Sequence, residues 1–160
     1  NLHNLINIFL KIFVFFDLLI SFMNMYFNTM NIKSSQDLVD EAKKSIKTLT
    51  SDEVKNLSNN SEITLIDIRD IRELWKEGTI ENSIHIPRGM LEFWLDPNSS
   101  YYKANKIKDI KKIVLFCALG FRSALATKSL VDMGFENVAH VEGGFDSLKK
   151  IGLKVVKKEK

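Results

Sequence analysis

The chain has 160 residues, of which 45% are hydrophobic and 27% are charged, proportions typical of a globular domain with a single core. Its net charge of +3 is too small to favour nucleic acid as a partner. One cysteine excludes internal disulfides and paired-cysteine redox centres and, with only three scattered histidines, disfavours a zinc site.

The first 29 residues differ from the remainder of the chain. Residues 8–27 are apolar and long enough to span a bilayer, but Lys11 and Asp17 interrupt them. A central acidic residue costs about 2.5–3.5 kcal/mol on insertion, and the segment lacks the basic start and cleavage site of a signal peptide. Three interpretations stay open: translation begins at Met30, residues 8–27 anchor the chain in a membrane, or the segment packs on the domain as a helix. We expect one domain over residues 30–160, cytoplasmic unless the anchor is real.

After Met30, segments typical of strands alternate with segments typical of helices. The pattern predicts strands at 46–49, 63–68, 84–86, 113–116 and 138–140, and helices at 34–44, 50–57, 70–76, 88–94, 123–133 and 145–151. Thr50 and Glu53 have the spacing of a capping box. The alternation predicts an α/β fold with a parallel sheet covered by helices on both faces. The basic tail from Lys154 is expected to be a solvated end.

Cys117 lies where a buried strand gives way to a helix. Backbone N–H groups and the positive end of the helix dipole favour the thiolate there, and Arg122 adds a full charge. The Cys-x4-Arg loop contains Ala118, Leu119, Gly120 and Phe121, and Ser123 follows Arg122. A loop of this length predicts a cradle for one anionic atom beyond the sulfur, such as the outer sulfur of a persulfide. Phosphate-handling cysteine enzymes typically use one residue more. A small buried core cysteine is the alternative interpretation.

Four segments, taken together, resemble the rhodanese-like family of single-domain sulfurtransferases. They are the loop 117–123, the stretch 67–78 with Asp67, Arg69, Glu73 and Gly78, the Ile-Pro stretch 84–89, and the Gly-Gly turn within 141–146. The resemblance implies a rhodanese-like fold with a mostly parallel central sheet and helices on both faces. It also implies transfer of sulfane sulfur from thiosulfate or a persulfide, through a Cys117 persulfide, to a thiol or cyanide. Neither a metal nor an organic cofactor is expected.

The resemblance also suggests supporting residues outside the loop. Asp67 and Arg69 end a central strand, and they either orient the loop or form a structural ion pair. Arg88 follows the Ile-Pro stretch and is expected to meet an anionic donor. His85 is expected to be a core or strand-end histidine, with a catalytic base as the alternative.

Two other functions stay open. Leu119 and Phe121 replace side chains that are commonly small or polar in the family's loop, and they suit a module that carries sulfur or binds a protein without turnover. A small cysteine phosphatase or arsenate reductase is the other alternative. The Cys-x4-Arg spacing counts against it, and so does the lack of a second cysteine to act as a resolving thiol.

Overall fold

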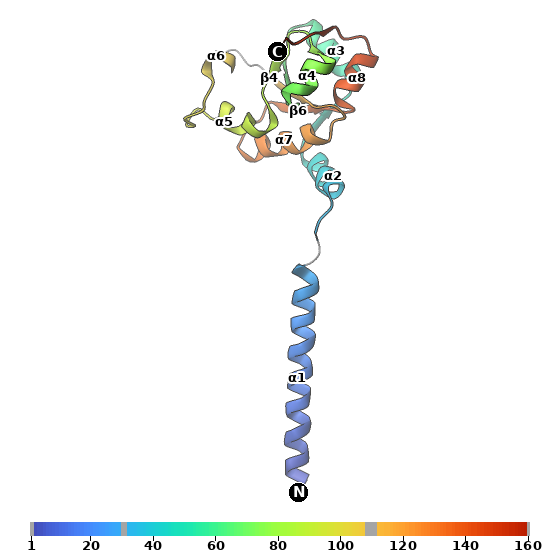
Figure 1. Cartoon of the computed structure of the whole chain (residues 1–160), viewed down its shortest axis with the longest axis vertical. Coiled ribbons are helices and arrows are strands. Elements are labelled where there is room, and N and C mark those ends of the chain that lie inside the picture. The colour runs from blue at the N-terminus through green and yellow to red at the C-terminus, as the bar shows by residue number, and fades with distance from the viewer. Residues whose placement is uncertain (1, 30–31, 108–111, 160) are drawn as a thin grey trace. The chain divides into compact units, whose positions relative to one another are not determined.

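The computed structural model describes residues 2–29, 32–107 and 112–159, and the chain divides into two compact units, Asn1–Ser34 and Ser35–Lys160. The first unit contains a single helix, α1 (Leu2–Thr29), drawn in blue in Figure 1. Its stretch Ile8–Met25 is long and apolar enough to cross a membrane and is not buried, properties that it shares with signal sequences. All three interpretations of this segment therefore stay open.

The second unit is built on a five-stranded parallel sheet. Its strands lie in the order β1 (Lys47–Leu49), β6 (Val138–Val141), β5 (Lys112–Phe116), β2 (Ile63–Asp67) and β4 (Ile84–His85). Every neighbouring pair is parallel, and the register places Asp67 opposite Phe116. The strands are short apolar runs, as expected where helices cover both faces of a sheet. The predicted α/β fold class is confirmed.

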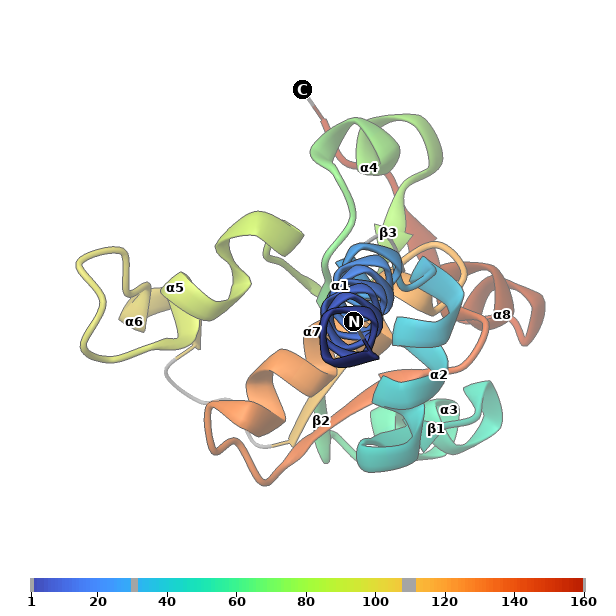
Figure 2. The same cartoon turned by 90° about the horizontal axis from the view of Figure 1, so that it is seen from below.

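Apolar side chains pack on both faces of this sheet, and helices lie around it. They are α2 (Ser35–Ser45), α3 (Ser51–Asn59), α4 (Ile71–Glu77), the 3-10 turn η1 (Arg88–Met90), α5 (Leu91–Leu95), α6 (Ala104–Ile107), α7 (Phe121–Asp132) and α8 (Gly144–Lys150). In Figure 2, α3 and α8 lie to the right, and α5 and α7 to the left. Side chains of β5 alternate between two buried clusters: Leu115 packs with Leu91 and Leu130, whereas Val114 packs with Val54 and Leu148.

The local signals correctly placed most helix ends. The Glu53 N–H donates to the Thr50 hydroxyl at 3.2 Å and the Thr50 N–H donates to the Glu53 carboxylate at 2.8 Å, which is the predicted capping box. The prediction that the helix after Cys117 begins at Ser123 is wrong, because α7 begins at Phe121. Gly120 precedes it at φ +95°, a left-handed conformation that glycine adopts readily. This start places Arg122 in the first turn of the helix.

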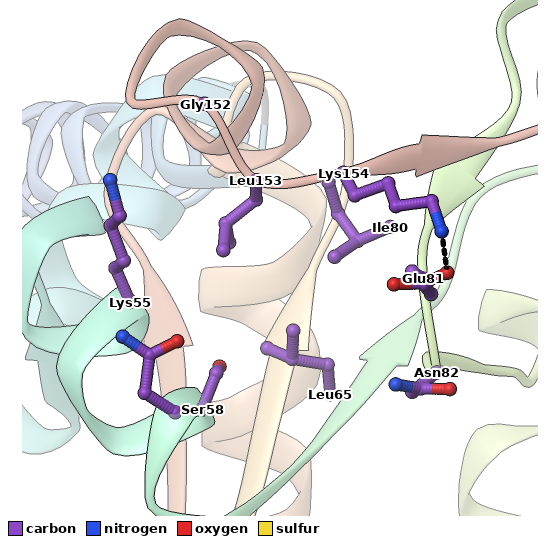
Figure 3. A pocket seen from close by; sticks show the side chains of 10 residues that line it. Lys55, Ser58, Leu65, Ile80, Glu81, Asn82, Gly152, Leu153 and Lys154 are labelled. Atoms are coloured by element: carbon purple, nitrogen blue, oxygen red, sulfur yellow. Dashed lines mark ion pairs between the residues drawn. The ribbon is translucent and has the colours of Figure 1, made fainter.

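A second, small sheet was not predicted. Strand β3 (Thr79–Ile80) pairs antiparallel with β7 (Val155–Val156), so part of the tail that was expected to be a solvated end forms an edge strand, although Val155 stays exposed. Two-residue strands this far apart leave no periodic pattern in the sequence. Beside this sheet lies a cavity of about 310 Å³ with Leu65, Ile80 and Leu153 among its lining residues (Figure 3). No residue of the 117–123 loop lines that cavity.

Candidate active site

Cys117 follows β5 directly, and the loop after it turns back over the sulfur. The residue is only 1% exposed, and the Gly120 N–H donates to its Sγ atom at 3.2 Å. The start of α8 supports the loop from within the domain. The Phe145 N–H donates to the Cys117 carbonyl at 2.7 Å, and the Asp146 N–H donates to the Ala118 carbonyl at 3.2 Å. The loop conformation is therefore held by backbone hydrogen bonds at both ends.

Two glycines permit this close packing of loop and helix. A Cβ atom on Gly144 would lie 2.3 Å from the Cys117 carbonyl oxygen, closer than any real contact, and Gly144 has φ +55°. A Cβ atom on Gly120 would lie 3.1 Å from the Val141 carbonyl oxygen. Gly120, Gly143 and Gly144 all have positive φ, which glycine adopts readily because it has no Cβ atom.

The first turn of α7 presents backbone donors beside the sulfur. The helix's hydrogen bonding starts with the Ala124 N–H, which donates to the Gly120 carbonyl at 3.0 Å. The N–H groups of Phe121, Arg122 and Ser123 come before that bond, and such groups have no partner within a helix. The buried Ser123 hydroxyl also donates to the Gly120 carbonyl, at 3.0 Å. Backbone donors and helix dipole together can stabilise an anion at this point.

Arg122 forms a two-pronged ion pair with Glu73. Its Nη1 and Nη2 atoms lie 2.7 and 2.9 Å from the two carboxylate oxygens. This pairing lowers the pKa of Glu73 below its ordinary value. The pKa of Arg122 is raised, chiefly by the hydrogen bond to Glu73 and, to a smaller extent, by Cys117. Glu73 is therefore the main partner of the Arg122 guanidinium.

Sequence reasoning did not predict that Glu73 contacts Arg122. The Glu73 carboxylate also accepts the Asp70 N–H at 3.0 Å, completing a capping box at the start of α4. The Asp-x-x-Glu spacing predicts that box, but it gives no indication that Glu73 meets an arginine 49 residues away. The register of β2 beside β5 brings the two segments together.

Asp67 and Arg69 form the structural ion pair that was one of the two interpretations. Both are fully buried, and the Arg69 Nη2 lies 2.8 Å from the Asp67 carboxylate. Arg69 also donates to Glu77 at 3.1 Å and to the Gly78 carbonyl at 2.7 Å. Its guanidinium carbon lies 3.8 Å from the centre of the Phe145 ring, whose backbone holds Cys117. The pair supports the loop through Phe145.

The structure does not bring Arg88 into the loop. Arg88 donates to the Glu92 carboxylate at 2.8 Å and to the Ser129 hydroxyl at 3.4 Å, and among the described residues no hydrogen bond or ion pair joins its side chain to residues 117–123. His85 lies at the end of β4, where its Nε2 atom is 2.9 Å from the Arg69 carbonyl oxygen. Leu119 and Phe121 are 53% and 47% exposed, so both present apolar surface near the thiol.

Residues 50–151 match the sequence model of the rhodanese-like domain. The chain belongs to the rhodanese-like domain family. The match begins at the N-cap of α3 and ends after α8, so it includes the Cys117 loop, Glu73 and the buried Asp67–Arg69 pair. The strand β7 lies outside it.

Relatives of this rhodanese-like chain are named for different activities. It is 33% identical over 103 residues to thiosulfate sulfurtransferase/rhodanese-like domain-containing protein 3 of Mus musculus, covering 62% of this chain and 66% of that protein. It is 31% identical over 96 residues to a tRNA uridine(34) hydroxylase of Photorhabdus laumondii, covering 60% of this chain and 26% of the hydroxylase. The chain thus spans less than two thirds of these relatives.

A solved structure from Rhodopseudomonas palustris CGA009 is also similar to this chain. The two share 44% sequence identity with a TM-score of 0.72, over 78% of this chain and 95% of the other. That protein is described as of unknown function and a "possible tyrosine phosphatase". Family membership therefore supports sulfurtransferase-type chemistry in general terms and leaves the substrate open.

Proposed function

We propose that the chain is a sulfurtransferase that carries sulfane sulfur on Cys117. In the first step the Cys117 thiolate attacks the outer sulfur of thiosulfate or a persulfide. A new sulfur–sulfur bond forms as the donor's bond breaks, and sulfite or a thiolate leaves with the electron pair. In the second step a thiolate or cyanide attacks the outer sulfur, and the Cys117 thiolate is released. This is two-step nucleophilic catalysis.

The observation that best supports this proposal is the arrangement of donors around one sulfur atom. The Gly120 N–H already points at Sγ at 3.2 Å, and the first N–H groups of α7 follow Gly120 directly in the chain. Cys117 is only 1% exposed, so a donor must insert its terminal sulfur to react. Fixed donors of this kind stabilise a developing negative charge without reorganising during the reaction.

A binding module without turnover is the second candidate. The exposed side chains of Leu119 and Phe121 would suit contact with a protein, either as the sulfur acceptor or as a binding partner. Such a module would take up sulfur once and release it only to that protein. Turnover with cyanide separates the two candidates, because only an enzyme with an accessible persulfide passes sulfur repeatedly to a small acceptor.

Intact mass after incubation with thiosulfate tests the proposal directly. We expect the protein to gain one sulfur atom, cyanide to remove it, and Cys117→Ser to gain none, since Cys117 is the single cysteine of the chain. A Cys117→Ser variant that still turned over thiosulfate would contradict the mechanism. Hydrolysis of an aryl phosphate ester, at a rate exceeding sulfur transfer, would favour a phosphatase.

A further inference from the structure

At the opening of the site, the positive charge of Arg122 is balanced by the negative charge of Glu73. Arg122 is the single charged residue of the segment 117–123, and both prongs of its guanidinium are occupied by Glu73. The capping-box bond from the Asp70 N–H holds the Glu73 carboxylate in this position. A dianion that approaches Cys117 therefore meets a neutral pair rather than a free cation.

Other nearby cations are paired in the same way. Arg72 in the first turn of α4 lies 2.7 Å from Asp70, and Arg88 lies 2.8 Å from Glu92. Within the described segment 67–92, the three arginines each have a carboxylate partner, because Arg69 is held by Asp67. The N-terminus of α7 offers an anion about half an elementary charge of positive potential.

The rim of the site is apolar. Leu119 and Phe121 flank Gly120, and about half of each side chain is exposed to solvent. A hydrocarbon group bound there would remove apolar surface from water, which a sulfonate group would not do. Weak positive charge and an apolar rim together favour a donor with an organic body and at most one negative charge.

We propose that Glu73 is a specificity-determining residue that, by neutralising Arg122, directs the site toward organic hydropersulfides and away from dianionic thiosulfate. This inference rests on the proposed sulfurtransferase function. The favoured step joins the Cys117 thiolate to the terminal sulfur of R–S–SH. The sulfur–sulfur bond of the donor breaks, R–S⁻ leaves with the electron pair, and the proton stays on the new persulfide until the base of the medium removes it.

The test compares kcat/KM for thiosulfate and for benzyl hydropersulfide in the full chain and two variants. Glu73→Gln removes the charge, while glutamine can still cap α4. Glu53→Gln is the matched control, since Glu53 completes the same kind of capping box at α3. We expect Glu73→Gln to raise the thiosulfate-to-hydropersulfide ratio about tenfold, as for one uncovered charge near the reacting sulfur. Glu53→Gln should leave the ratio unchanged.

A measurement on the unsubstituted chain tests the inference even if the Glu73→Gln variant fails to fold. The unsubstituted chain's kcat/KM for thiosulfate should change little with ionic strength, because a neutral pair offers little for salt to screen. A steep fall with salt, a preference for thiosulfate, or an unchanged ratio in Glu73→Gln would overturn the inference. The proposed function fails separately, if no donor places sulfur on Cys117.

Discussion

Two arginine–carboxylate pairs lie close together in this domain, and they differ in burial. Asp67 and Arg69 are both inaccessible to solvent, whereas the side chains of Glu73 and Arg122 are 30% and 44% exposed. The buried pair joins residues two apart in the chain, and the exposed pair joins residues 49 apart. Both have guanidinium–carboxylate distances below 3 Å.

The difference shows how one type of contact serves two purposes. A buried pair must have all its hydrogen bonds satisfied, because breaking it leaves a charge without solvent. Arg69 meets this demand with Asp67, Glu77 and the Gly78 carbonyl, which makes it part of the scaffold. An exposed pair opens at little cost, since water replaces each partner. The Glu73–Arg122 pair therefore contributes little to the stability of the fold and sets the charge at the site instead.

The largest effect is expected at the buried pair. Asp67→Asn leaves the Arg69 guanidinium buried without its main counter-charge, so we expect a loss of about 3–5 kcal/mol in the free energy of unfolding. Asp70→Asn is the matched control: Asp70 pairs with the exposed Arg72, and asparagine caps a helix as well as aspartate does. Denaturant unfolding of both variants measures the difference. Equal losses would show that burial does not separate the two pairs.

A substitution at Gly144 tests whether packing against α8, rather than the Arg122 ion pair, holds the Cys117 loop in place. Gly144→Ala places a methyl group 2.3 Å from the Cys117 carbonyl oxygen, so the loop must move. We expect a loss of about 1–3 kcal/mol in stability from backbone strain, together with weaker sulfur transfer. Gly134→Ala is the control, because Gly134 also has positive φ but its added methyl group would meet nothing within 4 Å. Sulfur transfer that survives in Gly144→Ala as in Gly134→Ala would contradict this account.

His140, a buried residue of β6, tests the interior of the sheet by its pH dependence. Burial is the main cause that lowers the pKa of His140 below its ordinary value of 6.5, with Lys43 acting in the same direction and Glu142 against it. The unfolded chain therefore binds a proton that the folded chain does not, and stability should fall as the pH drops below about 6.5. Unfolding free energies measured across that range should slope less in His140→Gln. An identical slope would show that other groups control the acid response.

The smallest effect on stability is expected at the exposed pair. Glu73→Gln should cost less than about 1 kcal/mol at neutral pH, since exposed ion pairs contribute little. Because pairing lowers the pKa of Glu73 below 4.5, its contribution is present above that pH and is lost as the pH falls further. Unfolding curves of the two proteins should therefore converge in acid. A loss as large as that of Asp67→Asn would make Glu73–Arg122 a scaffold pair as well.

Much of the fold could be predicted from local patterns. The short apolar runs around Leu65, Val114 and Ala139 form parallel strands, and the Thr50–Glu53 spacing forms the expected capping box. The exact start of α7 was missed, because Phe121 and Arg122 have no local feature that favours the first turn over a loop. The β3–β7 pairing was missed because each strand has two residues.

The sequence by itself determined where the proposed nucleophile lies, because the strand, the cysteine, the glycine and the arginine are neighbours within one short segment. Only the tertiary structure decided what Arg122 contacts. Sheet order places β2 beside β5 and so brings α4 and its Glu73 to the Cys117 loop, whereas Arg88, also expected near the donor, pairs with Glu92 instead. The physical reason is that strand and helix patterns reflect forces between near neighbours, whereas charge pairing across 49 residues depends on packing of the whole domain.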